Sequence, residues 1–312
     1  MEFNRTELMP GVFLSHLCSD KFKTACMSVT LLTQLRRETA AMNAVIPFVL
    51  RRGTTRYSDM EQLSRRMDEL YGAAVEPVVR RIGEIQCIGF YGSFPEPDYL
   101  PGGEALLGDT CALMAQLLLD PVTRGGLLLP QYVDSEREKL LDIIRSRMND
   151  KRSYALTRCI EEMCCYEDFA VSRFGSESEA ENIHYKKLTR HYRELIQTCP
   201  VEIFYCGKTD FKAVSAAMRD AFSAMPRGEI DYDIGTDLRM NAVEDHVRFV
   251  EEEMDVTQGK LSMGFRCDTD DEPAMILANL MFGGSSNSKL FLNVREKLSL
   301  CYYASSLYHR QK

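Results

Sequence analysis

The histidines of this sequence, which are the side chains most typical of a catalytic zinc site, do not fall at ligand spacing. A zinc-binding helix places two histidines four residues apart with a glutamate beside one of them, as in H-E-x-x-H or H-x-x-E-H. No two of the five histidines have this spacing; they are His16, His184, His191, His246 and His309. His184 and His191 lie two helical turns apart in a polar stretch and are interpreted as solvated surface residues. We therefore predict no complete metal centre in this chain.

Motifs for nucleophilic or phosphate chemistry are also missing. The sequence contains no G-x-S-x-G, no P-loop and no G-x-G-x-x-G. The run Gly283-Gly284-Ser285-Ser286 could bind a phosphate through its backbone N–H groups. It lacks the Lys-Ser/Thr that follows in a P-loop, however, and it stands between two predicted helices rather than after a strand. A nucleotide site is therefore not predicted, and the three glutamates of 251–253 are interpreted as a strand edge facing water.

Composition and charge narrow the class of protein. The 312 residues are 45% hydrophobic and 27% charged, which is typical of globular chains, and their number suits two domains. The net charge of −8, with acids and bases interspersed, argues against a nucleic-acid partner. No apolar run approaches the roughly 20 residues of a membrane-spanning helix, and the N-terminus has no apolar signal region. Eleven cysteines without C-x-x-C spacing are typical of reduced thiols, so we expect a soluble cytoplasmic protein.

Strands and helices alternate in the first half of the sequence. A β-branched and apolar run predicts a strand over 25–35, and a helix follows over 38–50, interrupted by Pro47. Ser58 and Glu61 have the spacing of a capping box that starts the next helix. Further strands are predicted over 73–79 and 84–94, helices over 103–119, 131–148 and 153–166, and a polar connecting segment from 172–182.

A second unit is expected from residue 201. The predicted elements are a strand over 201–207, a helix from the N-cap Asp210 to about Phe222, a loop over 226–237, a strand pair over 247–253 and 260–267, helices over 272–282 and 288–298, and a last strand over 300–308. Both halves then place helices on one face of an antiparallel or mixed sheet, which predicts an α+β fold of two related domains. The predicted domains are 1–185 and 201–312, with a linker over 186–200. The second is short and ends directly after a strand, so we expect it to be incomplete.

Two segments resemble a known family. Residues 281–306, MFGGSSNSKLFLNVREKLSLCYYASS, contain in order a Gly-Gly-Ser turn, Ser-x-Leu-Phe, Arg-Glu-Lys and Leu-x-Tyr. This order closely resembles the signature late in the C-terminal domain of the pitrilysin/insulinase-type metallopeptidases, the inverzincins. Residues 51–77 resemble the stretch after the zinc helix of their N-terminal domain, and 253–265 resemble the strand pair before the signature. The resemblance covers most of the chain and implies a clamshell arrangement of the two domains.

The resemblance also locates the zinc positions. In active members the H-x-x-E-H motif directly precedes a Gly-Thr, which corresponds to Gly53-Thr54 here. Counting back places the two histidines and the glutamate on Ala44, Pro47 and Phe48. The third ligand, a more distant glutamate, corresponds to Glu136. One carboxylate cannot hold Zn²⁺, which needs three protein ligands. The resemblance therefore implies a zinc-less member, similar to the bacterial non-catalytic peptidase-like subunits.

The resemblance implies that another part of the family's active site is retained in this chain. Arg295 and Tyr302 match the Arg–Tyr pair that faces the zinc from the other half of the clamshell, next to the loop Gly283-Gly284-Ser285. A guanidinium can grip a peptide carbonyl or carboxylate, and a phenol can donate a hydrogen bond to the oxyanion of a tetrahedral intermediate. On residue types alone, Arg295 could instead cap its helix and Tyr302 could pack in the sheet. The surrounding motif favours the active-site interpretation.

Two functions are implied by this resemblance. The first is a non-catalytic subunit of a heterodimeric zinc metallopeptidase, with zinc held only by a homologous partner chain and a peptide substrate bound by the pair. The second is a non-enzymatic scaffold or peptide-binding protein of the same fold. A homodimer remains an alternative when the partner is absent, and an enzyme whose remaining domain lies outside these residues is a third, weaker alternative.

Overall fold

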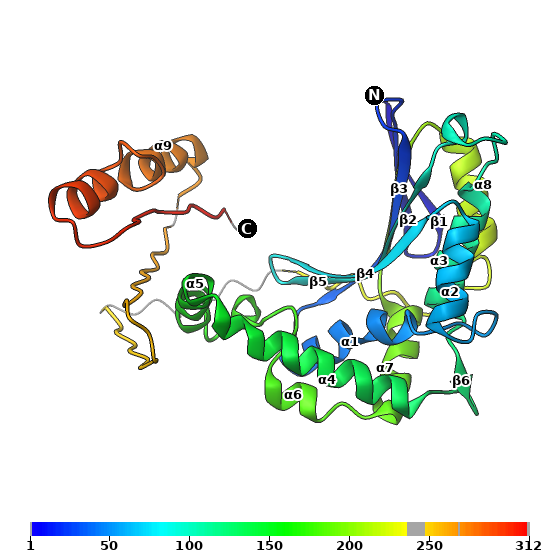
Figure 1. The fold of residues 1–312 in the computed structure, drawn as a ribbon, viewed down its shortest axis with the longest axis horizontal. Coiled ribbons are helices and arrows are strands. Elements are labelled where there is room, and N and C mark those ends of the chain that lie inside the picture. Colours follow the sequence, from blue (N-terminus) through cyan, green and yellow to red (C-terminus); the bar gives the residue numbers. More distant parts are fainter. Residues whose placement is uncertain (1, 236–246, 268, 311–312) are drawn as a thin grey trace. The chain divides into compact units, whose positions relative to one another are not determined.

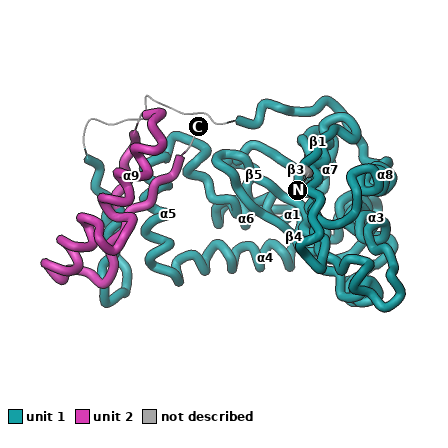
Figure 2. The backbone as a smooth tube through the Cα atoms, turned by 90° about the horizontal axis from the view of Figure 1, so that it is seen from above, with its two compact units in different colours: residues 1–262 teal, residues 263–312 magenta. Residues whose placement is uncertain are grey.

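A computed structural model describes residues 2–235, 247–267 and 269–310, and the chain divides into two compact units, residues 1–262 and 263–312 (Figure 2). The strands of the first unit are β1 (Glu2–Met9), β2 (Val12–Cys18), β3 (Thr24–Gln34), β4 (Ala74–Ile82), β5 (Ile85–Pro95), β6 (Thr123–Arg124), β7 (Leu127–Leu128) and β8 (Val201–Gly207). Its helices are α1 (Ala40–Leu50), α2 (Met60–Glu69), α3 (Leu107–Leu119), α4 (Pro130–Ser146), α5 (Lys151–Met163), α6 (Glu177–Glu181), α7 (Tyr185–Thr198) and α8 (Phe211–Phe222) (Figure 1).

A six-stranded mixed sheet organises the first unit, in the order β1-β2-β8-β3-β5-β4. Strand β8 runs parallel to β2 and antiparallel to β3, so it joins the N-terminal hairpin to the remaining three strands. Alternate strand residues such as Val12, Met27, Ile88 and Ile203 are buried on one face. Helices α1, α3, α7 and α8 pack against the strands and share this core. The predicted α+β class, with helices covering one face of a mixed sheet, is confirmed.

Helix α1 lies inside the core because its sequence is apolar on nearly every side. Ten of its eleven residues are buried, and Phe48 is half-buried. The prediction that Pro47 interrupts this helix is wrong, since α1 continues to Leu50 and the Arg51 N–H donates to the Pro47 carbonyl at 3.1 Å. Proline removes one backbone hydrogen bond, but packing on all sides of α1 offsets this loss.

Helix α2 begins one residue later than the predicted capping box requires. Its N-cap is Asp59 rather than Ser58, and the Asp59 carboxylate accepts a hydrogen bond from the Gln62 N–H at 2.9 Å. This bond lowers the pKa of Asp59. A carboxylate is favoured at this place because it also interacts with the positive end of the helix dipole. The sequence does contain a true capping box, formed by Ser176 and Glu179 at the start of α6.

The division between the two units differs from the sequence prediction. The strand 201–207, expected to open the second domain, lies in the first sheet between β2 and β3. The expected linker 186–200 is mostly helix α7, whose Leu188 and Leu195 are buried in the same core. Contacts divide the chain after residue 262 instead. A strand's partners are not visible in its local sequence, and β8 pairs with strands from the beginning of the chain.

The strands predicted over 247–253, 260–267 and 300–308 do not pair in the described part of the chain. Their apolar side chains alternate but are exposed, with Phe249 at 90% and Leu261 at 84%. Glu252, expected at a strand edge facing water, is held by α5 instead. It accepts hydrogen bonds from Arg158 Nε at 2.7 Å and from the Tyr154 hydroxyl at 3.0 Å, and the Arg158 bond lowers the pKa of Glu252. Alternation produces a strand only where a neighbouring backbone supplies hydrogen bonds.

The second unit contains helix α9 (Glu272–Phe282) and a π-helical segment, Phe291–Lys297, where helices were predicted over 272–282 and 288–298. Asp271 caps α9 by accepting a hydrogen bond from the Ala274 N–H at 3.0 Å. Ser306 folds back onto the end of this helix, because its N–H donates to the Gly283 carbonyl at 3.1 Å. Among the described residues, none of the helices combines the length and the apolar character that crossing a bilayer requires.

Candidate functional site

The three zinc positions inferred from the sequence lie on α1, inside the first unit. Ala44 is fully buried, Pro47 is buried and Phe48 is half-buried. None of these side chains carries an atom that can bind zinc. Within residues 2–235, 247–267 and 269–310, no three histidine, cysteine or carboxylate side chains gather as a potential metal cluster. The residues at this place therefore do not fit a zinc ion.

Glu136 on α4 does present a buried carboxylate, with 6% of the residue exposed, but two cations already bind it. Arg52 Nε donates to its Oε1 at 2.5 Å, and Lys139 Nζ donates to the same oxygen at 2.9 Å. Arg52 also donates to Ser135 Oγ at 2.6 Å, and its guanidinium lies 5.5 Å from the centre of the Tyr132 ring. A buried carboxylate needs a compensating cation, and here a guanidinium that follows α1 supplies it in place of a metal.

A buried polar network, which was not predicted from the sequence, lies next to the inferred zinc positions. Asn43, adjacent to Ala44, donates from Nδ2 to Gln86 Oε1 at 2.8 Å. Gln86 Nε2 in turn donates to the carbonyls of Ala40 at 3.0 Å and Arg173 at 2.7 Å. Both Asn43 and Gln86 are fully buried. The signal was present, because an asparagine inside an apolar helix must find buried partners. Arg52 was missed because nothing local shows which carboxylate its side chain reaches.

His191 on α7 completes this network and corrects its interpretation as a solvated residue. Its Nε2 lies 2.6 Å from Asn43 Oδ1. That amide oxygen can only accept, so His191 carries its proton on Nε2 and donates it. The side chain is half-buried, and burial lowers the pKa of His191. His184, by contrast, is the N-cap of α7, and its Nδ1 accepts from the Lys186 N–H at 3.4 Å.

Acidification should destabilise the first unit partly through His191. Because its pKa is lower in the folded than in the unfolded chain, its contribution is full above the unfolded value of about 6.5 and is lost as the pH falls below it. His191→Gln keeps an amide donor for Asn43 and removes the titration. We expect the free energy of unfolding, measured with urea at pH 7.5 and 5.5, to fall less in this variant than in the unchanged protein. Equal falls would show that His191 does not titrate in this range.

Arg295 and Tyr302, the retained Arg–Tyr pair, are neighbours in the second unit. Arg295 lies in the π-helical segment, and its Nε donates to the Tyr302 carbonyl at 3.1 Å. Its guanidinium also pairs with Glu296 and lies 4.7 Å from the centre of the Phe291 ring. The Tyr302 side chain does not pack in a sheet, since 81% of the residue is exposed. The Arg295–Tyr302 contact therefore fixes the backbone between them and leaves the phenol accessible.

The loop Gly283-Gly284-Ser285 follows α9 and is closely fastened to residue 306. A Cβ on Gly283 would lie 2.6 Å from the backbone nitrogen of Ser306, so a larger residue cannot be placed there without moving the chain. Ser306 Oγ also donates to Asn279 Oδ1 at 2.7 Å. The loop thus holds the segment that carries Tyr302 against the end of α9. We assign it a supporting role rather than a phosphate-binding one.

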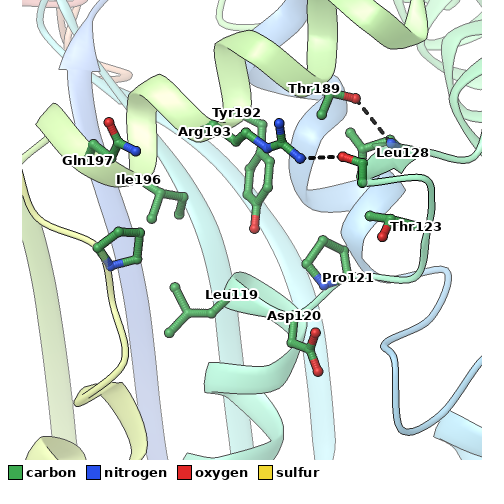
Figure 3. Close-up of a pocket in the computed structure, with 12 residues that line it drawn as sticks. Leu119, Asp120, Pro121, Thr123, Leu128, Thr189, Tyr192, Arg193, Ile196 and Gln197 are labelled. Carbon is green, nitrogen blue, oxygen red and sulfur yellow. Dashed lines mark hydrogen bonds between the residues drawn. The ribbon is translucent and has the colours of Figure 1, made fainter.

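A cavity of about 350 Å³ lies in the first unit where the end of α3, the β6–β7 hairpin and α7 meet (Figure 3). Three of its lining side chains already have hydrogen-bond partners in the protein. Arg193 donates to the Gly126 carbonyl, the Leu128 N–H donates to Thr189 Oγ1 at 3.1 Å, and the Tyr192 hydroxyl donates to the Leu118 carbonyl at 2.7 Å. None of the residues predicted for the site lines it. We assign no ligand to this cavity.

Comparison with known proteins gives consistent matches. The family model described as "Peptidase M16 inactive domain" matches residues 182–312. The chain is 33% identical over 310 residues to the "Probable inactive metalloprotease YmfF" of Bacillus subtilis (strain 168), and the match covers 97% of this chain and 71% of that protein. A conserved protein from Enterococcus faecalis V583 superposes with a TM-score of 0.81 at 22% identity, covering 97% and 71% of the two chains. Pitrilysin superposes with a TM-score of 0.57 at 11% identity over 77% of this chain and 25% of its own. These two structures show a shared fold.

Proposed function

This chain belongs to the M16 peptidase family, of the pitrilysin type, and on this premise we propose that it is the non-catalytic subunit of a heterodimeric zinc metallopeptidase. It is an inactive-type member of that family. The partner in this proposal is a homologous chain that carries an intact H-x-x-E-H motif and the zinc ion. This chain contributes peptide binding and transition-state contacts through Arg295 and Tyr302.

The observation that carries the proposal is the contrast between the two predicted halves of the site. The zinc positions on α1 are filled by core side chains, and Glu136 is bound by Arg52 and Lys139. Tyr302 is exposed, and Arg295 holds the Tyr302 backbone. An exposed phenol can donate to an oxyanion formed at a zinc ion on another chain.

The test uses the full chain and a zinc-bearing homologue from the same genome. The two proteins are purified separately and together, and cleavage of a fluorogenic peptide library is measured. The mixture should cleave peptides and the lone chain should not. Tyr302→Phe in this chain should lower the kcat of the mixture by about 10²–10³-fold, the effect of removing one oxyanion donor. Arg295→Ala should raise KM, because it removes a cation that can grip the peptide.

Tyr303→Phe is the matched control, since it removes the neighbouring phenol and should leave kcat unchanged. Size-exclusion chromatography must show that each variant still associates with the partner. If Tyr302→Phe leaves kcat unchanged in an intact heterodimer, the proposed transition-state role is wrong. Stoichiometric zinc on the lone chain, measured by metal analysis, would contradict the proposal that only the partner chain holds the zinc ion.

A non-enzymatic scaffold of the same fold is the second candidate. One observation favours it: alternating apolar side chains are exposed in two short runs, Val247 and Phe249 and then Leu261, Met263 and Phe265. Such a run can form a strand on a partner's sheet edge. A scaffold would bind peptide or partner, alone or as a homodimer, with no effect of Tyr302→Phe on any cleavage rate. The same set of variants therefore separates the two candidates.

A further inference from the structure

Two cysteines face each other across neighbouring strands in the middle of the main sheet. Cys26 on β3 is the direct register partner of Cys206 on β8, and both are free thiols. Ala25, Met27 and Tyr205, next to them in sequence, are buried in the core. Because side chains alternate along a strand, Cys26 and Cys206 lie together on the opposite face of the sheet, away from the helices.

The spacing of this pair follows from the ladder. The Leu32 N–H donates to the Pro200 carbonyl at 2.9 Å, and the register places these two residues directly opposite each other. Hydrogen-bonded pairs recur at every second residue of an antiparallel ladder, so Cys26 and Cys206 also form a hydrogen-bonded pair. Such pairs have Cα atoms about 5.5 Å apart. This value lies within the range of about 4.4–6.8 Å that a disulfide spans.

The surroundings give the two thiols different properties. Cys26 is half-buried and Cys206 is 8% exposed, so Cys26 is the more accessible to small reagents. On the other side of β3, Cys26 lies opposite Ser93 of β5, so Cys206 is its only thiol neighbour in register. Burial is the main cause that raises the pKa of Cys206, with Cys26 contributing.

We propose that Cys26 and Cys206 form a reversible, oxidant-dependent disulfide across β3 and β8, with a hydroperoxide as the oxidant. Cys26 sulfur attacks the peroxide and takes one oxygen, which gives a sulfenic acid and releases water from hydrogen peroxide. The Cys206 sulfur then attacks the sulfenic sulfur and expels a second water as the S–S bond forms. The two thiols lose two electrons in total, and the O–O bond of one peroxide is reduced to two waters.

The same geometry makes this bond reversible. The Cβ atoms of opposed strand residues are about 4.5–5.5 Å apart and lie closer in non-hydrogen-bonded pairs, whereas a disulfide holds them at about 3.5–4.5 Å. Bond formation must therefore draw β3 and β8 together, and strained disulfides are the more easily reduced. The bond also links segments that are distant in sequence, which restricts the unfolded chain strongly. Oxidation should therefore raise the melting temperature, and thiol reductants should reverse the rise.

The experiment treats the reduced full-length chain with one to five equivalents of hydrogen peroxide and then blocks the remaining thiols with iodoacetamide. Peptide mapping by mass spectrometry should find Cys26 linked to Cys206, and each oxidised chain should carry two fewer blocked thiols than the reduced chain. The melting temperature should increase by several degrees. Dithiothreitol should restore both the thiols and the original melting temperature. A Cys18–Cys206 link, or oxidation of Cys26 without any link, would overturn the proposal.

Two variants separate the proposed pair from general thiol oxidation. Cys26→Ser should abolish the link and the peroxide-dependent rise in melting temperature. Cys87→Ser is the matched control, because Cys87 lies on β5 of the same sheet opposite Leu32 and Arg80 rather than a cysteine. It should leave both effects intact. If Cys26→Ser does not fold, the peptide map of the unchanged protein still decides, because it identifies the linked residues directly.

Discussion

Arg52→Met should destabilise the first unit by about 2–3 kcal/mol, measured as the change in free energy of unfolding in urea. Removing one member of a buried ion pair typically costs about 3–5 kcal/mol, because the remaining charge stays buried without a partner. The expected loss is smaller here because Lys139 still donates to Glu136, and because the Arg52 side chain is 20% exposed. Arg52→Met/Glu136→Met should recover most of the loss, since an apolar pair can replace a buried ion pair.

An exposed ion pair on α2 provides the control. Arg65 and Glu61 lie 2.9 Å apart with side chains 70% and 82% exposed, and Arg65→Met should change stability by less than about 0.5 kcal/mol. If Arg52→Met has an effect as small as this, the guanidinium does not neutralise a buried carboxylate. A double variant no more stable than Arg52→Met would show that the loss comes from packing of the Arg52 side chain against Tyr132 instead.

Gly89→Ala should have the largest effect of any single methyl group added to the sheet. Gly89 lies on β5 opposite Thr30 of β3 and has a φ of +155°. A Cβ at this position would overlap the backbone carbonyl oxygen of Val29, which cannot rotate away. The strands must separate or the backbone must change conformation. Strain of about 1–3 kcal/mol and overpacking of about 1–3 kcal/mol together predict a loss of about 4 kcal/mol. Urea unfolding followed by circular dichroism measures it.

Gly108→Ala is the matched control, since Gly108 lies in α3, and a Cβ there would have no heavy atom within 4 Å. This change should be neutral or stabilising by up to about 1 kcal/mol, because alanine favours the helix and restricts the unfolded chain. The prediction for Gly89 is contradicted if both variants unfold at the same urea concentration as the unchanged protein.

The elements that could be predicted from the sequence are those that their own neighbouring residues specify. Strand β3 was placed within one residue by its β-branched and apolar run, and Asp210 was correctly identified as the N-cap of α8. The two strands of the N-terminal hairpin were not predicted, because most residues of β1 are polar and this strand depends on pairing with β2. The position of β8 could not be predicted either, since its neighbours are chosen by the assembled sheet.

For the site, the motif comparison predicted the positions, and their environments became visible only in the structure. Ala44, Pro47 and Phe48 were identified by counting from a Gly-Thr, and their lack of ligating atoms is visible in the sequence alone. That Arg52 binds Glu136 depends on how α4 packs against the end of α1. The family membership inferred from residues 281–306 is confirmed by the family match and by the relative from Bacillus subtilis.

The place of β8 in the sheet also fixes the order in which the protein can fold during its synthesis. The β1–β2 hairpin and the β3–β5–β4 group leave the ribosome early, but no ladder joins them until Val201–Gly207 has emerged. Contacts between distant parts of a chain form slowly, and unpaired strand edges attract other chains. A nascent chain that stalls before β8 therefore carries two open edges, on β2 and β3, and this is the stage at which it most needs protection from aggregation.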